Sequence, residues 1–326
     1  MNKLVSTVPL VGAVFLAVFM TSMTAEAASC CGGGSAAALL LPKYGKAEIS
    51  VNTSFEQYDG FWDGTGVWTP DPAGSNLSQS RMTVGGAYRL GDRWQLAASL
   101  PFVWNNNRYT GLTSLTSGFG DAAVTLRYET FDGIKCVWNV DTWEDLIPAI
   151  YLSSTVTVPT GISPYDDVKN NFDITGRGFY RADANILIDK TIYPWNMSVS
   201  MTYGTHIERP INREYGTYIK PYRKQLGDRA SVAGNVGYTY FTDSMQSWTT
   251  TFTYADLRED QAVIDGQKDT TSGLRKRSLS MALAWSSSDR DWIINTSWNH
   301  SIQLDSWGRN FPTTDIISLG VSYVFR

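Results

Sequence analysis

The chain has 326 residues, and its formal net charge of −4 predicts no basic surface of the kind that binds nucleic acid. Charged residues make up only 18% of the chain and aromatic residues 13%. A mean hydropathy of −0.20 excludes a membrane protein built from many apolar helices. Few charges, many aromatic rings and a near-neutral mean favour a membrane β-barrel, in which apolar and polar residues alternate.

The N-terminal residues 1–27 have the features of a cleaved signal peptide. Lys3 gives a positive start, Leu4–Met20 is apolar, and Ala25-Glu26-Ala27 is a small-residue cleavage site. After Ala27 no apolar run approaches the roughly 20 residues that a membrane helix needs. We therefore expect a mature chain outside the cytoplasm that either is free in solution or spans a membrane as strands.

Residues 28–43 are rich in Ala, Gly and Cys, and we expect a flexible periplasmic tail. Its apolar stretch Ala36–Leu41 is an alternative docking segment for a partner or for the barrel lumen. Cys30, Cys31 and Cys136 make an odd number of cysteines, which predicts one disulfide plus a leftover thiol or a lipidated Cys30. The sharper alternative is that the vicinal pair binds a soft metal or exchanges disulfides. We predict no cofactor and no established metal site.

From Tyr44 onward, apolar and polar residues alternate with period 2, which indicates strands with one apolar and one polar face. We predict twelve such strands, each long enough to cross a membrane when tilted. They lie in the following ranges: 44–56, 79–90, 94–102, 120–131, 148–159, 179–189, 197–203, 232–240, 248–254, 279–285, 292–299 and 315–326. The fold class is therefore all-β, a transmembrane antiparallel β-barrel over residues 44–326.

Long polar loops alternate with short turns, so both chain ends should lie on the short-turn, periplasmic side of the outer membrane. We expect loops at Trp104–Gly118, Glu208–Arg229 and Arg258–Arg275. The long connection Asp132–Leu146 is the exception, and we expect a small hairpin or a helical turn there. Aromatic residues gather at the strand ends, as in the girdles at the two membrane interfaces. A soluble β-sandwich is the competing fold, but its strands are usually shorter.

Strand parity places a mixed set of polar residues on the face toward the lumen. A ring of one charge sign would select ions, and the mixture of signs argues against strong ion selectivity. The charged members either brace the barrel as ion pairs or contact the solute at a constriction. The predicted pore-lining residues are Glu48, Arg81, Arg89, Asp121, Arg127, Glu129, Asp183, Asn185, Asn235 and Asn295.

Gly118-Phe119-Gly120-Asp121 lies where a loop re-enters the barrel wall. We expect a turn in which Asp121 accepts hydrogen bonds from free backbone amides, with a loop folded into the pore as the alternative.

Several segments resemble one family. These are Ala98–Trp104 (ASLPFVW), Ser117–Tyr128 (SGFGDAAVTLRY), Pro148-Ala149-Ile150 and Thr155–Gly161 (TVTVPTG). Their order is similar to that in the transporter-type outer-membrane proteins of the meta-pathway of phenol degradation. The resemblance covers mainly residues 85–205. It implies an outer-membrane barrel for uptake of small, often aromatic, compounds, and it carries over no catalytic residues.

We therefore expect a passive channel or facilitator for small solutes, including aromatic or hydrophobic compounds, and no enzyme. Its expected partners are outer-membrane lipid, the solute and the barrel-assembly machinery. One alternative is a scaffold that docks a periplasmic or redox partner through the N-terminal tail. A lipid hydrolase is the other. His206 and His300 are the only histidines, and Ser301 points to the strand face opposite to His300.

Overall fold

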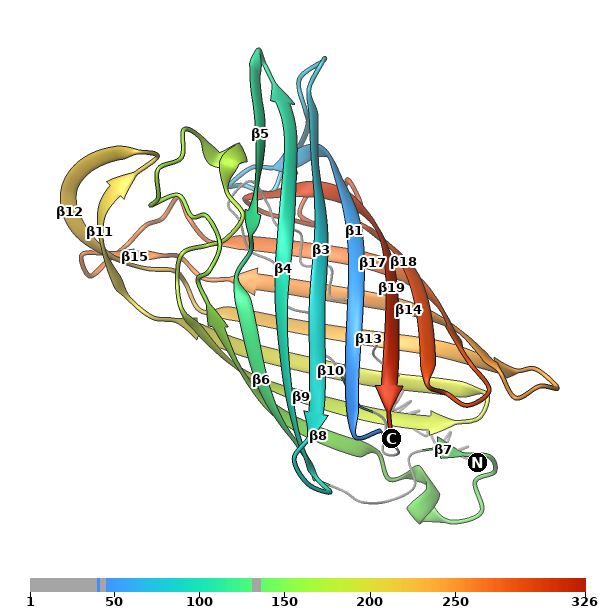
Figure 1. Ribbon diagram of the computed structural model, residues 1–326. Helices are drawn as coiled ribbons and strands as arrows, with labels where there is room; N and C mark the ends of the chain where they lie inside the picture. The colour runs from blue at the N-terminus through green and yellow to red at the C-terminus, as the bar shows by residue number, and fades with distance from the viewer. Residues whose placement is uncertain (1–39, 42–44, 131–135) are drawn as a thin grey trace, which may run out of the picture.

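The computed structural model describes residues 40–41, 45–130 and 136–326, and in these residues twelve antiparallel strands form a closed barrel (Figure 1). Each strand pairs with the next around the ring, and the last pairs with the first. The barrel strands are β1 (Ala47–Trp62), β3 (Asn76–Arg89), β4 (Trp94–Tyr109), β6 (Ala122–Glu129), β8 (Ala149–Val158), β9 (Arg181–Ile192), β10 (Trp195–His206), β13 (Arg229–Phe241), β14 (Ser247–Glu259), β17 (Leu274–Ser286), β18 (Trp292–His300) and β19 (Phe311–Phe325). The predicted strand number and fold class are confirmed.

The outer wall is apolar and the interior is polar, because the strand period of 2 sorts the side chains. On β1, Ile49 and Phe55 are about half exposed, whereas Glu56 on the opposite face is buried. Polar pairs join neighbouring strands inside, such as the half-buried Thr125 and Thr155, whose hydroxyl oxygens are 2.8 Å apart. No helix among the described residues is long and apolar enough to cross a membrane. An apolar outer wall around a polar interior is the architecture of an outer-membrane barrel.

The two ends of the barrel differ in their connections. One end, here called the turn end, holds the C-terminus and short connections such as Leu90–Arg93 between β3 and β4 (Figure 1). The other, the loop end, holds the long connections. Aromatic rings form an outward-facing girdle at the turn end, where Trp94 packs on Tyr128 with ring centroids 4.8 Å apart and Trp292 packs on Tyr323 at 4.9 Å.

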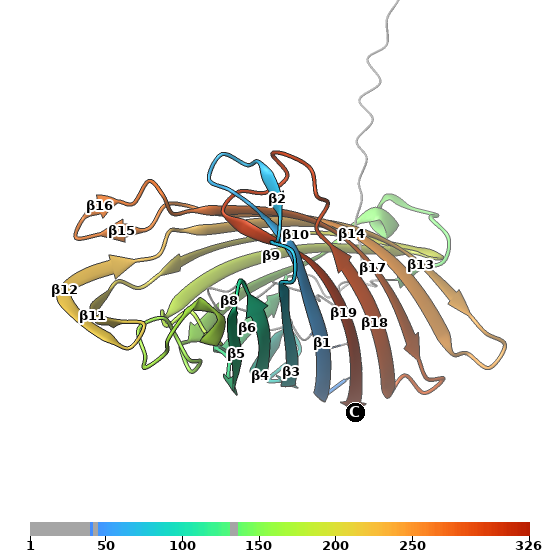
Figure 2. The same ribbon diagram turned by 90° about the horizontal axis from the view of Figure 1, so that it is seen from above.

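Three of the predicted loops are wrong in part, because strands continue past the barrel at the loop end. The additional elements are β2 (Trp68–Pro70), β5 (Leu112–Phe119), β11 (Arg209–Glu214), β12 (Thr217–Gln225), β15 (Val263–Ile264) and β16 (Gln267–Lys268). The pairs β11–β12 and β15–β16 form a separate four-stranded sheet that projects to one side (Figure 2).

These extensions are hairpins with two-residue turns whose backbone has positive φ. The turns are Thr110-Gly111, Tyr215-Gly216 and Asp265-Gly266, with φ values from 42° to 86°. Glycine at the second position permits this geometry, which matches the twist of the flanking strands. Apolar and polar residues do not alternate regularly in these flanking strands, so the pattern gave no signal for them.

The connection between β6 and β8 fits the prediction of a helical turn near the turn end. Its described part holds β7 (Cys136–Val137), which pairs parallel with β9, and a 3-10 turn η1 (Trp143–Leu146). A second 3-10 turn, η2 (Asn171–Asp173), lies in the connection between β8 and β9.

Candidate functional site

The connection between β8 and β9, residues 159–180, folds into the loop end and is here called the inward loop. Ile174 and Thr175 are buried within it. The side-chain amide of Asn105 on β4 donates a hydrogen bond to the Ile174 carbonyl at 2.9 Å. Thr175 Oγ1 donates to the Phe119 carbonyl at 2.6 Å and accepts from the Ile162 amide at 2.8 Å. The barrel wall therefore holds the inward loop at two places.

Asp121 fixes the two ends of the inward loop. Its carboxylate accepts hydrogen bonds from the backbone amides of Gly161 at 3.1 Å and Arg177 at 2.7 Å. A Cβ atom on Gly161 would lie only 2.7 Å from the Gly176 Cα, so this close approach requires glycine. The predicted capping role of Asp121 is confirmed. Three of the segments that carry the family resemblance, Ala98–Trp104, Ser117–Tyr128 and Thr155–Gly161, thus meet near Asp121, whereas Pro148-Ala149-Ile150 lies toward the turn end.

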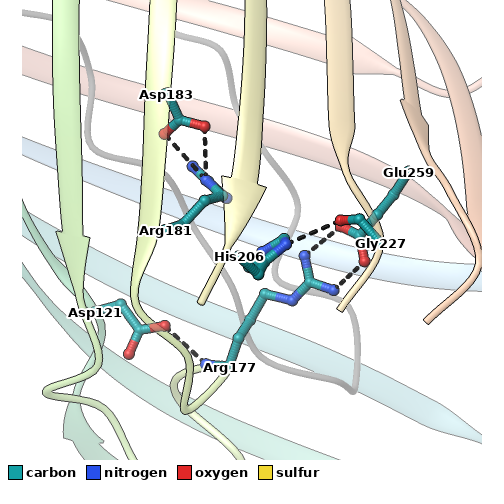
Figure 3. A network of polar contacts seen from close by, with 7 residues as sticks. All are labelled: Asp121, Arg177, Arg181, Asp183, His206, Gly227 and Glu259. Atoms are coloured by element: carbon teal, nitrogen blue, oxygen red, sulfur yellow. Dashed lines mark hydrogen bonds and ion pairs between the residues drawn. The ribbon is translucent and has the colours of Figure 1, made fainter. Parts of the chain in front are cut away.

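A network of ion pairs and hydrogen bonds lies beside Asp121 and includes Arg177 (Figure 3). The Arg177 guanidinium donates two hydrogen bonds of 2.5 Å to the two carboxylate oxygens of Glu259. Arg181 Nε contacts both oxygens of Asp183, at 2.8 and 3.0 Å. His206 Nδ1 lies 2.9 Å from the Gly227 carbonyl. Both Arg177 and Glu259 are largely buried, with side chains 15% and 6% exposed, and buried charges of this kind require close partners.

Above the network, the loop end contains a chamber of about 660 Å³. Aromatic rings form much of its wall, and Arg177 and Glu259 contribute to its lining. The aromatic lining residues are Tyr58, Phe61, Trp62, Tyr109, Tyr165, Phe172, Tyr215 and Phe311. The chamber wall also carries charged residues of both signs, so it combines apolar and aromatic surface with many polar groups. These charged lining residues are Asp71, Arg177, Glu214, Lys224, Arg229, Glu259, Asp260 and Asp269.

Two ionisable groups in the chamber wall are shifted toward their neutral forms. Burial raises the pKa of Asp71 above its ordinary value, and the neighbouring Asp59 carboxylate raises it further. Burial likewise raises the pKa of the Tyr165 hydroxyl, and the negative charge of Glu214 raises it further. Low solvation disfavours the charged form of both groups.

At the turn end, the described residues Leu40 and Leu41 lie inside the barrel. Leu41 is buried, and Gln95 on β4 holds its backbone on both sides. The Leu41 amide donates to Gln95 Oε1 at 3.1 Å, and Gln95 Nε2 donates to the Leu41 carbonyl at 3.3 Å. The Arg89 guanidinium reaches the same carbonyl at 3.4 Å. Leu40 packs on the buried cluster of Ala149, Tyr151 and Leu187. The described end of the expected flexible tail therefore lies inside the barrel.

The ten predicted pore-lining residues separate into groups. Asp121 and Asp183 belong to the network at the loop end, and Arg89 and the buried Arg127 and Glu129 lie toward the turn end. The remaining five lie along the interior. Glu48 is near enough to Arg127 to interact electrostatically, and Asn295 lies against Gly320. The other three make side-chain hydrogen bonds: Arg81 donates one to Gln79, Asn185 donates one to Thr202, and Asn235 accepts one from Thr253.

Strand parity missed Arg177, Glu259 and the contact of Gln95 with Leu41. Arg177 belongs to a loop, where no period exists. Glu259 lies at the end of β14, five residues past the predicted strand end. Continued alternation beyond Tyr254 would have placed Glu259 on the inner face.

Cys30 and Cys31 lie outside the described residues, and Cys136 starts β7. Of the two histidines, His206 belongs to the network, whereas His300 Nδ1 lies 2.9 Å from Asp315 and the His300 ring stacks on the outward Trp298.

No protein-family model matches the chain, and no curated protein matches it in sequence. The fold is similar to a crystal structure of an outer membrane channel from Pseudomonas putida F1, with a TM-score of 0.64, 14% identity, and coverage of 88% of this chain and 97% of that one. The beta domain of the Bordetella autotransporter BrkA has a TM-score of 0.49 and 9% identity, and the match covers 86% of this chain and 100% of that one. The toluene transporter TbuX of Ralstonia pickettii has a TM-score of 0.40 and 10% identity, and the match covers 86% of this chain and 90% of that one. The first match shows a shared barrel fold.

Proposed function

We propose that the protein is an outer-membrane channel that admits small solutes, including aromatic or hydrophobic ones, through the chamber at the loop end. The observation that carries this proposal is the chamber itself, with aromatic walls above an internally neutralised ion pair. Aromatic walls stabilise an apolar solute by burying its surface and by ring contacts. Charged residues of both signs line the chamber rather than a ring of one sign, so we expect no strong selection between cations and anions.

In this proposal the loop end faces the cell exterior and the turn end faces the periplasm. Bacterial barrels have short periplasmic turns and longer extracellular loops, and the two ends of this barrel differ in the same way. Assembly would depend on the barrel-assembly machinery. The fold shared with the outer membrane channel of P. putida supports a channel. The family resemblance in the segments around Asp121 supports aromatic compounds as solutes.

The test is solute entry into liposomes that contain the purified, folded protein. We expect faster entry of a small neutral aromatic solute than of a sugar of similar size. Phe172 lines the chamber, with its ring centroid 5.7 Å from that of Tyr109, and Phe172→Ala should slow aromatic entry. Phe252→Ala is the matched control, because Phe252 is 59% exposed on the outer wall. Folded protein that passes neither solute would contradict the proposal.

A further inference from the structure

A group of four charged residues lies on the outer wall at the loop end of β14 and β17, and is here called the arginine cluster. It consists of Asp256, Arg258, Arg275 and Arg277. The Asp256 carboxylate accepts hydrogen bonds from Arg275 Nη2 at 2.6 Å, from Arg277 Nε at 3.2 Å, and from Arg258 Nε and Nη2 at 3.2 Å each. One carboxylate thus orients three guanidinium groups, and the cluster keeps a net charge of +2.

Strand parity places the cluster on the lipid-facing side. The intervening residues Leu257, Glu259 and Leu274 line the chamber inside the barrel. Along the same outer face, toward the turn end, Tyr254 is 44% exposed and Leu279 is 43% exposed. The two belong to the apolar wall and stand directly opposite each other, and the next paired positions are Asp256 and Arg277. The arginine cluster therefore begins where the apolar wall ends, at the depth of lipid headgroups.

The connection between β18 and β19 extends the positive surface. The backbones of Arg309 and Arg275 pair through two hydrogen bonds of 2.9 Å, so the exposed Arg309 adds a further cation beside the cluster. The Trp307 ring lies 5.9 Å from the Arg277 guanidinium and 6.5 Å from the Tyr254 ring. An amphipathic ring beside cations at this depth is typical of the membrane interface.

Other outward charges near the loop end are not grouped in this way. Arg108 on β4 stands between the neutral Asn76 and Thr113 of the neighbouring strands, and Asp315 on β19 lies 2.9 Å from His300. An ion-pair lattice that only braced two strands would be balanced, with one acid for each base. Three arginines around one aspartate leave a concentrated positive surface that faces the lipid.

We propose that the arginine cluster binds the phosphate group of a phosphorylated glycolipid in the outer leaflet. Guanidinium groups form forked, charge-assisted hydrogen bonds with phosphate oxygens. Asp256 holds the guanidinium groups in place, so less side-chain entropy is lost when a phosphate binds. The choice of leaflet rests on the orientation given under the proposed function, but the binding site does not depend on whether the barrel conducts solutes.

The test compares lipids that bind to the detergent-solubilised full chain, counted by native mass spectrometry. The probes are a diphosphorylated glycolipid, the same glycolipid after dephosphorylation, a glycerophospholipid, and inorganic phosphate as competitor. We expect the phosphorylated glycolipid to bind about tenfold more tightly than its dephosphorylated form, a ratio typical of one or two charge-assisted hydrogen bonds. Inorganic phosphate at the same concentration should not displace it.

The double variant Arg275→Gln/Arg277→Gln should lose this preference. Arg108→Gln, at an exposed arginine on β4, is the control and should keep it. Equal binding of both glycolipid forms to the wild-type chain would overturn the proposal, and this comparison needs no variant to fold. Displacement by inorganic phosphate, or equally tight binding of the glycerophospholipid, would overturn it as well. Solute entry should be unchanged in the double variant, which separates this site from the channel.

Discussion

The two ends of the barrel interior are built from the same strands but are closed in different ways. At the loop end, the inward loop leaves a chamber of about 660 Å³ above the Arg177–Glu259 pair. At the turn end, Leu41 is buried and is held by Gln95 through both its amide and its carbonyl. The loop end therefore contains an open volume, whereas the described part of the turn end contains a stretch of chain fixed by hydrogen bonds. Segments outside the strands cause this difference, because the strand alternation is alike at both ends.

β4 allows the two ends to be compared with matched substitutions, because it has a buried amide side chain near each end. Gln95 holds Leu41 at the turn end, and Asn105 holds Ile174 of the inward loop at the loop end. Gln95→Ala removes both hydrogen bonds to Leu41 and leaves the longer contact from Arg89. We expect Gln95→Ala to raise single-channel conductance in planar bilayers several-fold and Asn105→Ala to change it little.

The opposite ranking, with the larger increase in Asn105→Ala, would show that the inward loop is the main barrier. Equal conductance in both variants and in the wild-type chain would show that neither contact controls passage. Heat-modifiable gel mobility checks that each variant forms the barrel.

The second substitution tests whether the ion pair at the loop end supports the fold. Glu259→Gln removes the carboxylate that accepts two hydrogen bonds from the buried Arg177 guanidinium, and breaking such a buried pair typically costs about 3–5 kcal/mol. We expect a clear fall in the midpoint of thermal unfolding, together with a shift of the reversal potential toward anion selectivity.

The control for this substitution is Glu208→Gln. Glu208 pairs with Arg223 in the exposed part of the loop end, where the side chains are 42% and 59% exposed. An exposed pair contributes little to stability, because solvent screens its charges. Similar stability of the two variants would show that the Arg177–Glu259 pair acts only as a surface ion pair does.

The smallest expected effect concerns pH at the chamber wall. The pKa of Asp71 lies above its ordinary value, so Asp71 becomes neutral at a higher pH than an exposed aspartate. As pH falls through this raised pKa, the chamber loses a negative charge. Entry of a neutral aromatic solute should then rise modestly, and Asp71→Asn should remove this pH step. A step of equal size in the variant would assign it to another group.

The sequence predicts the barrel well because one physical rule governs every strand. Residues such as Val84 and Tyr88 face lipid, while the neighbouring Arg89 faces inward, and this contrast repeats twelve times around the ring. The same rule cannot predict what fills the interior. Ile174 and Leu41 are apolar residues in segments without a period, and their burial depends on contacts with Asn105 and Gln95, which lie far away in the sequence.

The seam between β1 and β19 has a consequence for how the chain folds. Its antiparallel register runs from Ala47 opposite Phe325 to Trp62 opposite Phe311. These partners are separated by nearly the whole chain, so the entropy of loop closure makes this pairing the slowest to form. Until then the growing sheet has two unpaired edges that can join another chain. Protection of these edges, rather than formation of the individual hairpins, should therefore limit the yield of folded protein.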